Sequence, residues 1–466
     1  MDRIKAFFVP AKASADEYEP LADDESGTLP GSTYEEGAPF SWIEYSIFAL
    51  IGVAMLWAWN MFLAAAPYFQ TRFQSDSWIF DNSQSAILTT FTAVSLVTML
   101  ILSNIQSSAN YPFRISTALL ISAAVFVLLT ISTSVFLDAS PRAYFAFLLL
   151  MVALTAWAAG LMQNGAFSFA ASFGRPEYTQ AIMAGQGVAG ILPPLAQMLS
   201  FLAFSDSSPE VPPHEQPSGE RHSSSPSFLP PANKDGHAAF IYFLTAVLIS
   251  LVTMLAFIPL VRRHSHISRR LLGSQQQQEQ QRGQRRYVPL STLLRKLRWL
   301  AGSVFVCFVI AMFYPVFTAK ILSVHSSPSS SAGKIFTPGA FIPLAFFFWN
   351  LGDLLGRVST MMPSLSLRHR PRALFAISLA RCGFLPLYLL CNLHGEGAVV
   401  ESDLFYLLLV QFPFGLTNGW LGSSSMMAAG EWVDEEEREA AGGFMGLCLI
   451  AGLAAGSVLS FSAAGI

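Results

Sequence analysis

The sequence predicts an all-α, polytopic membrane protein with about eleven transmembrane helices. Hydrophobic residues occupy 53% of the 466 positions and charged residues 12%, about half of the roughly 25% that soluble domains carry. Most apolar residues fall in runs of about 20 or more, the length that a helix needs to cross the hydrocarbon core of a bilayer. A large soluble enzyme does not combine these features, so we expect a helical bundle embedded in lipid.

The apolar runs give the predicted spans in order. They cover residues 43–69, 84–104, 113–137, 143–173, 179–204, 238–261, 298–322, 336–361, 372–394, 403–430 and 440–463. Two polar connections separate some of them, a Ser/Pro-rich loop at 205–236 and a basic, Gln-rich loop at 262–297. Because the basic loop follows the sixth span, we expect a six-helix bundle over 43–261 and a five-helix bundle over 298–466.

Positive charge predicts the orientation. Lys and Arg near span ends mark the cytoplasmic side of a membrane, and the 262–297 loop opens with RRHSHISRR. An even number of spans precedes that loop, so the acidic tail 1–42 is predicted to be cytoplasmic as well. The loop at 205–236 and the C-terminus each follow an odd number of spans, which places them on the extracellular or lumenal face.

Charged side chains lie inside the predicted eighth span, FFFWNLGDLLGRV at 346–358. Arg357 follows Asp353 by four residues and Asn350 precedes it by three, so one helix face carries all three side chains. Charge in hydrocarbon is costly, which turns this face toward the bundle interior or a water-filled cavity. Two interpretations stay open. The pair either locks two helices together, or binds a polar substrate to which Arg357 donates and from which Asp353 accepts hydrogen bonds.

Other spans carry polar groups beside aromatic ones. Span one contains LWAWNMF, in which Trp59 and Asn60 are predicted to line a cavity with an aromatic face and an amide. Span four contains Gln163 and Asn164. Adjacent residues point about 100° apart on a helix, so at most one of these amides faces the cavity squarely. The other is expected to bond to a neighbouring helix.

Further motifs are predicted to shape helix packing. Pro315 in FYPVF is expected to bend span seven, with Tyr314 as a candidate cavity residue, and Asn418 lies in TNGWLGSSS of span ten. The prolines in MAGQGVAGILPP predict a kink or break in span five. The same stretch places three small residues that favour close approach of another backbone: Gly185, Gly187 and Gly190.

The sequence lacks the motifs of several other function classes. No GxxxxGK[ST] loop is present, which argues against an ATP-driven pump, and no HExxH or paired-cysteine motif predicts a metal site. An intramembrane aspartyl protease needs two embedded aspartates, whereas Asp353 stands alone in the interior of the predicted spans. We therefore expect no enzyme activity, no cofactor, no metal and no nucleic-acid partner. The rival class is a non-transporting membrane enzyme or scaffold.

Four motifs together resemble the equilibrative nucleoside transporter family. They are WAWN at 57–60, GQGxAG at 185–190, NxxDxxxGR at 350–357 and FGxxNG at 414–419. The resemblance extends over most of the chain and includes the long cytoplasmic loop after span six. It implies a two-bundle arrangement of six and five helices, similar to the major facilitator architecture. It also implies movement of nucleosides, and in some members nucleobases, by alternating access.

The resemblance also implies roles for individual residues. Trp59, with Leu56 beside it, would form an aromatic wall against the nucleobase. A span-four amide would contact the base, which is Asn164 by ungapped matching from GQGxAG, or Gln163 if the loop differs by one residue. The ribose hydroxyls would bind to the matching residues of span eight: Asp353 and Arg357, with Asn350 in support.

The predicted function is therefore nucleoside transport. Facilitated diffusion is slightly favoured over proton coupling, because Asp353, the only deeply placed carboxylate, has a cationic partner in Arg357. The alternative is a carrier of the major facilitator type for another small polar solute, such as a sugar or a drug. The expected partners are a nucleoside and the lipid bilayer. The sequence leaves open the plasma membrane and the vacuolar or lysosomal membrane, and the oligomeric state.

Overall fold

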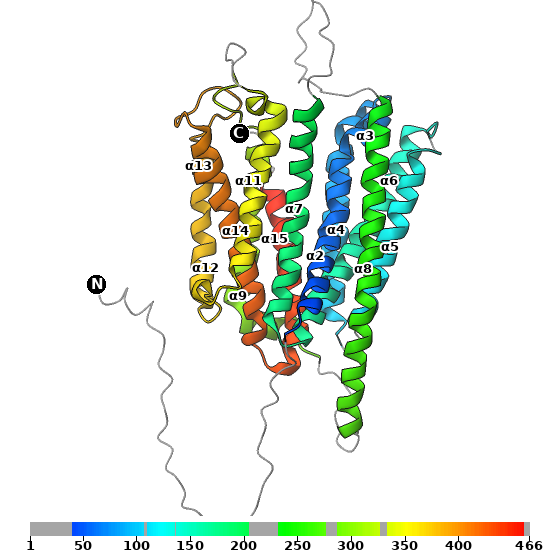
Figure 1. Cartoon of the computed structure of the whole chain (residues 1–466), viewed down its shortest axis with the longest axis vertical. Helices are drawn as coiled ribbons and strands as arrows, with labels where there is room; N and C mark the ends of the chain where they lie inside the picture. The colour runs from blue at the N-terminus through cyan, green and yellow to red at the C-terminus, as the bar shows by residue number, and fades with distance from the viewer. Residues whose placement is uncertain are drawn as a thin grey trace, which may run out of the picture. The chain divides into compact units, whose positions relative to one another are not determined.

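The computed structural model describes residues 40–106, 110–135, 137–204, 232–275, 287–326 and 333–460. Within these ranges the chain is built from helices, which run side by side in Figure 1. The one β contact there is an isolated antiparallel bridge between Ile321 and Leu393. Parts of three predicted polar segments lie outside the described residues: 1–39 of the acidic tail, 205–231 of the Ser/Pro-rich loop and 276–286 of the basic loop.

The first part of the chain forms six passes. The first, α2 (Trp42–Ala64), continues after Ala65 as the short α3 (Ala66–Phe73). The others are α4 (Ser77–Asn104), α5 (Tyr111–Ser132), α6 (Pro141–Ser172), α7 (Pro176–Phe204) and α8 (Ala232–Gln275). The predicted break in span five does not occur, because α7 continues through Pro193 and Pro194. Membrane helices tolerate internal proline where neighbouring groups satisfy the freed backbone atoms.

The second part forms five passes. The seventh is α9 (Leu290–Ala311), which restarts as α10 (Tyr314–Thr318) with Pro315 in its first turn. The eighth is α11 (Pro338–Ser359) and the last is α15 (Arg438–Ser460). The ninth consists of α12 (Pro371–Ala380), η3 (Arg381–Gly383) and α13 (Phe384–Tyr388), and the tenth of the π-helical η4 (Phe405–Gln411) and α14 (Phe412–Ala428). Short 3₁₀ turns lie in the connections: η1 (Lys334–Phe336), η2 (Pro363–Leu365), η5 (Ala429–Glu431) and η6 (Glu435–Glu437).

The number of passes matches the prediction. Nine helices of the described chain are long and apolar enough to cross a membrane. The ninth and tenth passes are interrupted, so their α-helical pieces are only 10, 5 and 17 residues long. Figure 1 shows both running alongside the other helices. With them the described bundle has eleven passes.

Polar side chains fix where the first helices begin. The side chain of Ser41 accepts a hydrogen bond from the first turn of α2, and Asp76 does the same for α4. Asn110 and Ser140 cap α5 and α6 in this way. These residue types are preferred at helix N-termini because their oxygens satisfy backbone N–H groups that lack a helical partner.

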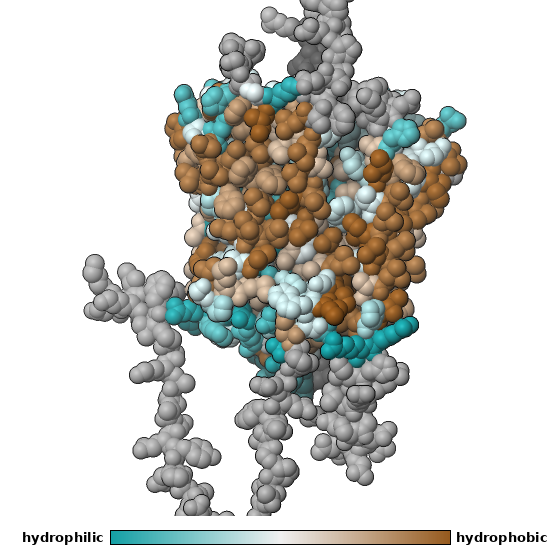
Figure 2. Space-filling model, viewed as in Figure 1, coloured by the Kyte–Doolittle hydropathy of each residue, from teal (hydrophilic) through white to brown (hydrophobic). Residues whose placement is uncertain are grey.

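The outer surface suits a bilayer. Figure 2 shows an apolar band across the visible face, with polar rims at its two ends. Large apolar side chains on the passes are exposed, including Leu100, Val127, Leu150, Leu255 and Leu409. Such a surface is far larger than the apolar patches of soluble monomers. Lipid is its natural solvent, so the protein is an integral membrane protein.

One helix extends well beyond the bilayer thickness. α8 has 44 residues, about 66 Å at 1.5 Å per residue, against roughly 30 Å of hydrocarbon. Figure 1 shows its lower end below the other helices. The helix therefore continues into the predicted basic loop as far as Gln275.

Glycines bring two helix pairs into backbone contact. A Cβ atom at Gly185 of α7 would lie 1.9 Å from the carbonyl oxygen of Ala49 in α2. A Cβ at Gly419 of α14 would lie 1.8 Å from the carbonyl oxygen of Asp353 in α11. Real side chains do not fit at such distances, so glycine is required at both positions. α2 with α7, and α11 with α14, each form a tightly joined pair.

The two groups of helices meet along two seams. One runs between α7 of the first group and α11 of the second. The other runs between α15, the last helix, and both α6 and α4. At the second seam, a Cβ at Gly442 would lie 2.5 Å from the carbonyl oxygen of Phe167. The first seam contains the charged pair of span eight.

Candidate functional site

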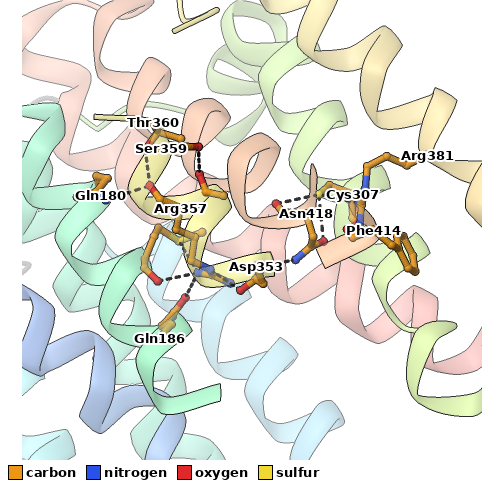
Figure 3. A network of polar contacts seen from close by, with 12 residues as sticks. Gln180, Gln186, Cys307, Asp353, Arg357, Ser359, Thr360, Arg381, Phe414 and Asn418 are labelled. Carbon is orange, nitrogen blue, oxygen red and sulfur yellow. Dashed lines mark hydrogen bonds and ion pairs between the residues drawn. The ribbon is translucent and has the colours of Figure 1, made fainter. Parts of the chain in front are cut away.

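The ion pair of span eight is present and buried. Arg357 Nε lies 2.6 Å from Asp353 Oδ2, one helical turn apart on α11. Both residues are buried, with exposed fractions of 3% for Asp353 and 6% for Arg357. Figure 3 shows the pair at the centre of a polar network that draws on several helices. The i and i+4 spacing thus places both groups on one face, as expected for a helix.

Arg357 also reaches across the seam to α7. Its Nη1 donates to the carbonyl oxygen of Met183 at 2.9 Å and to Gln186 Oε1 at 3.2 Å. In return, Gln180 Nε2 donates to the carbonyl oxygen of Arg357 at 3.0 Å. Gly187 leaves room for this contact, because a Cβ there would lie 3.2 Å from Arg357 Cδ. One guanidinium therefore joins the two groups of helices.

Asp353 is held from its other side by α14. Asn418 Nδ2 donates to Asp353 Oδ1 at 2.7 Å. The short distance depends on the close approach of α14 to α11, which Gly419 permits. One donor on each carboxylate oxygen suits a charged acceptor. Asn418, predicted as a packing residue, is therefore a direct partner of the aspartate.

The pair keeps unused hydrogen-bonding capacity. A carboxylate oxygen offers about two acceptor sites, and each oxygen of Asp353 accepts one of the hydrogen bonds described above. Arg357 Nη2 donates to none of the described residues, whereas Nε and Nη1 are engaged. Acceptor and donor sites thus stand side by side. Across the described ranges no group of three His, Cys, Asp or Glu side chains could hold a metal ion.

Aromatic and amide groups continue the site along α11. Tyr314 of α10 stacks on Trp349 with ring centroids 3.8 Å apart and planes 2° from parallel. Asn350 donates to the carbonyl oxygen of Phe346 at 2.8 Å. Its side-chain oxygen lies 2.6 Å from the point that a Cβ on Gly190 would occupy. Gly190 thereby makes space for the amide of Asn350 at the α7–α11 seam.

The candidate residues of α2 lie beside α7 and α4. Leu56, Trp59 and Asn60 are half-buried. Asn60 Nδ2 donates to the carbonyl oxygen of Ala189 at 2.8 Å, one residue before Gly190. Trp59 packs on Phe91 with ring centroids 4.2 Å apart. Trp59, half-buried as a residue, therefore presents an aromatic side chain next to α4.

The two amides of α6 are buried and have different partners. Gln163 Nε2 donates to the carbonyl oxygen of Gly446 in α15 at 3.3 Å. Asn164 Oδ1 accepts a hydrogen bond from Arg114 Nη1, whose guanidinium also donates to the carbonyl oxygen of Ile105. No described hydrogen bond joins either amide to the α11 pair. The α6 amides and the ion pair therefore form separate polar groups.

Comparison with known proteins decides the family. A family model described as nucleoside transporter matches residues 149–213 and 261–464, more than half of the chain. The chain belongs to the nucleoside transporter family. The transporter is 30% identical to nucleoside transporter FUN26 of Saccharomyces cerevisiae, over 90% of this chain and 83% of that protein. It is 26% identical to human equilibrative nucleoside transporter 1, over 89% of this chain and 95% of that protein.

Solved structures confirm the predicted architecture. The transporter matches the major facilitator protein FucP in its outward conformation with a TM-score of 0.52 and 14% identity, over 91% of this chain and 92% of that one. It matches the proton:xylose symporter XylE with a TM-score of 0.54 and 9% identity, over 89% and 87%. At these identities the likeness shows the fold alone. That fold is the two-bundle, major-facilitator-like arrangement expected from the sequence.

Several residues of the transporter's polar network are not predicted from the sequence. Gln186 lies inside the GQGxAG motif, whose glycines alone predict a packing role, and it accepts a hydrogen bond from Arg357. Arg381 is a charged residue within the predicted span 372–394, and the rule that singled out Asp353 applies to it equally. Met183 contributes a backbone oxygen and Cys307 a thiol. Neither residue type signals a polar contact in a sequence.

Proposed function

We propose that this transporter carries nucleosides by alternating access, with the ribose bound between Asp353 and Arg357. The observation that carries the proposal is the unused capacity of that pair, with acceptor sites on Asp353 and a donor group at Arg357 Nη2. Vicinal hydroxyl groups both donate and accept hydrogen bonds. A ribose therefore satisfies a carboxylate and a guanidinium that lie side by side. Asn350 and Tyr314, next along the seam, complete this half of the site.

The nucleobase contacts come from the first bundle. Trp59 presents an aromatic side chain, and Leu56 lies one turn before it on α2. Of the two α6 amides, Asn164 has its oxygen engaged by Arg114, whereas Gln163 Oε1 has no hydrogen-bond partner among the described residues. Gln163 is therefore the better candidate to read the base. Asn164 serves the packing of α5 on α6.

Facilitated diffusion fits the hydrogen bonds at Asp353 better than proton coupling does. Arg357 Nε and Asn418 Nδ2 both donate to the carboxylate. Substrate hydroxyls donate to the remaining acceptor sites, so binding needs no proton on Asp353. Net transport then follows the nucleoside gradient alone.

Alternating access requires the α7–α11 seam to open. Tyr45 of α2 donates to Gln180 Oε1 at 2.7 Å, and Gln180 donates to Arg357. These contacts lie toward the end of the bundle where α2 and α7 begin. With the cytoplasmic N-terminus that the basic loop favours, they close the cytoplasmic side. The C-terminus then lies on the extracellular or lumenal side.

Uptake into proteoliposomes tests the proposal. The purified transporter is reconstituted, and entry of radiolabelled uridine is followed at equal internal and external pH and again with an inward proton gradient. We expect saturable uptake that excess adenosine inhibits, that glucose does not, and that the gradient leaves unchanged. Liposomes containing Asp353→Asn provide the matched control for leakage. Uptake inhibited by glucose, or absent with every nucleoside, would contradict the proposal.

A further inference from the structure

A second arginine lies buried behind Asp353. Arg381 stands at the junction of α12 and η3, and 2% of its surface is exposed. Its Nη1 donates to the carbonyl oxygen of Cys307 at 2.9 Å and to Cys307 Sγ at 3.0 Å. Nε donates to Thr417 Oγ1 at 3.2 Å, and Nη2 to the carbonyl oxygen of Phe414 at 3.3 Å. Every one of these partners is neutral.

Arg381 has no acidic partner within ion-pair distance among the described residues. A buried arginine without a carboxylate is costly inside a membrane protein and marks a functional position by default. The nearest part of the network that carries negative charge is Asp353, which Arg381 reaches only through Cys307 and Asn418. Figure 3 shows these residues in a row, with Arg381 at one end and the ion pair at the other.

The row has a fixed hydrogen-bond direction. A guanidinium can only donate, so the sulfur of Cys307 accepts from Arg381. The thiol proton of Cys307 then has its acceptors on Asn418, whose Oδ1 lies 3.4 Å and whose backbone oxygen lies 3.7 Å from Sγ. An amide whose oxygen accepts in this way presents its NH₂ group at the other end. Asn418 Nδ2 lies 2.7 Å from Asp353 Oδ1.

We propose that Arg381 is a positioning residue that sets ribose specificity through Cys307 and Asn418. By holding the Cys307 thiol against Asn418, it keeps the Asn418 amide in place as a donor to Asp353, which accepts at both oxygens. The site then selects substrate groups that donate hydrogen bonds at this point, the 2′- and 3′-hydroxyls of a ribose. The inference rests on the proposed nucleoside function and deepens it.

Without Arg381, the row loses its anchor at one end. Cys307 Sγ loses the charged donor that holds it, so the thiol no longer fixes the position of Asn418 Oδ1. The Asn418 amide is then held less firmly, and the donor that orients Asp353 is less well placed. Binding of ribonucleosides weakens, while nucleosides that lack both hydroxyls lose little. The distinguishing quantity is therefore the affinity ratio between uridine and 2′,3′-dideoxyuridine.

The test measures that ratio with the full-length transporter in proteoliposomes, from inhibition of labelled adenosine uptake. We expect Arg381→Met to lower the ratio by about tenfold, as loss of a charge-assisted hydrogen-bond chain implies. Arg381→Lys, which keeps a charged donor, should preserve most of the ratio. A purely structural role would lower the amount of active protein and leave the ratio unchanged.

A second pair of variants keeps the test decisive if Arg381→Met does not fold. Cys307→Ala interrupts the row and leaves Arg381 its bonds to Thr417, Phe414 and the residue 307 carbonyl. Cys307→Ser retains a group that accepts and donates. We expect the first to lower the ratio and the second to keep it.

The outcomes distinguish a failure of the role proposed for Arg381 from a failure of the proposed ribose site. A wild-type transporter that binds uridine and 2′,3′-dideoxyuridine equally well would overturn the proposed ribose site, and with it the role of Arg381. A wild-type transporter that discriminates, with the ratio unchanged in Cys307→Ala and Arg381→Met, would overturn the inference alone.

Discussion

Arg357 Nη1 lies 2.9 Å from the carbonyl oxygen of Met183, and this hydrogen bond joins α11 to α7 across the seam between the two bundles. The same guanidinium forms the ion pair with Asp353. In the proposed site, substrate hydroxyls that bind to the pair act on the group that holds the bundles together. A ligand shifts a conformational equilibrium only through different contacts in the two states. In the proposed mechanism, Arg357 provides this difference, because its hydrogen bond to Met183 is present only while the seam is closed.

Loss of either member of the pair should abolish transport. Asp353→Asn removes the charge with little change in volume, and Arg357→Ala leaves a buried carboxylate without its cation. We expect uridine uptake to fall at least about 100-fold in both, because breaking a buried pair costs roughly 3–5 kcal/mol. Uptake per copy of membrane-inserted protein, quantified by a fluorescent fusion, is the measurement. Normal uptake by both variants would remove the pair from the site.

The contact between α11 and α14 should tolerate no side chain at Gly419. A Cβ there would meet the backbone oxygen of Asp353 at 1.8 Å, so Gly419→Ala must separate the helices and move the carboxylate. We expect a loss of about 1–3 kcal/mol in stability, read as a lower melting temperature in detergent. Gly236→Ala is the matched control, since a Cβ at that helical glycine meets nothing within 4 Å. Equal melting temperatures for the two variants would contradict the packing described above.

The hydroxyl of Tyr45 should stabilise the closed seam. Tyr45→Phe removes its bond to Gln180, worth about 0.5–1.5 kcal/mol, and should favour the state open at that end by roughly two- to tenfold. A cysteine placed at Met427, which lines a cavity of about 80 Å³ between the α6–α7 and α14–α15 connections, reports the change. Its labelling by a water-soluble maleimide should accelerate. Tyr287→Phe, at an exposed tyrosine, is the control; identical rates in both would count against the seam contact.

Substitutions of the two α6 amides should have different effects. Asn164→Ala takes a partner from the buried guanidinium of Arg114, which should cost about 1–3 kcal/mol of stability. Gln163→Ala removes only one long hydrogen bond, at 3.3 Å, and should instead alter the preference between adenosine and uridine. Thermal unfolding and competition uptake measure the two effects. If Asn164→Ala altered the substrate preference and Gln163→Ala lowered the stability, Asn164 would be the residue that contacts the base.

The fold was accessible from sequence because the bilayer imposes simple demands. The lengths of the apolar runs predict the passes. The basic segment at 262–297 separates the first six passes from the last five. Sequence reasoning erred where tertiary context intervenes. Of the kink or break predicted at Pro193 and Pro194, the break does not occur, and helix α8 continues into the segment predicted as a basic loop. Both outcomes depend on neighbours that a single segment does not reveal.

The site was accessible only in part. Asp353 and Arg357 lie on one helix, so their spacing was enough to pair them. Their partners Met183, Gln186 and Asn418 come from other helices, and glycines bring those backbones close. A backbone oxygen such as that of Met183 leaves no trace in a sequence.

A structure of the transporter determined with uridine bound tests the central claim most directly. We expect the ribose hydroxyl oxygens to lie about 2.6–3.2 Å from the Asp353 carboxylate and from Arg357 Nη2. We also expect the uracil ring to lie against Trp59. A nucleoside bound elsewhere in the bundle, with the Asp353–Arg357 pair untouched, would contradict the proposed site.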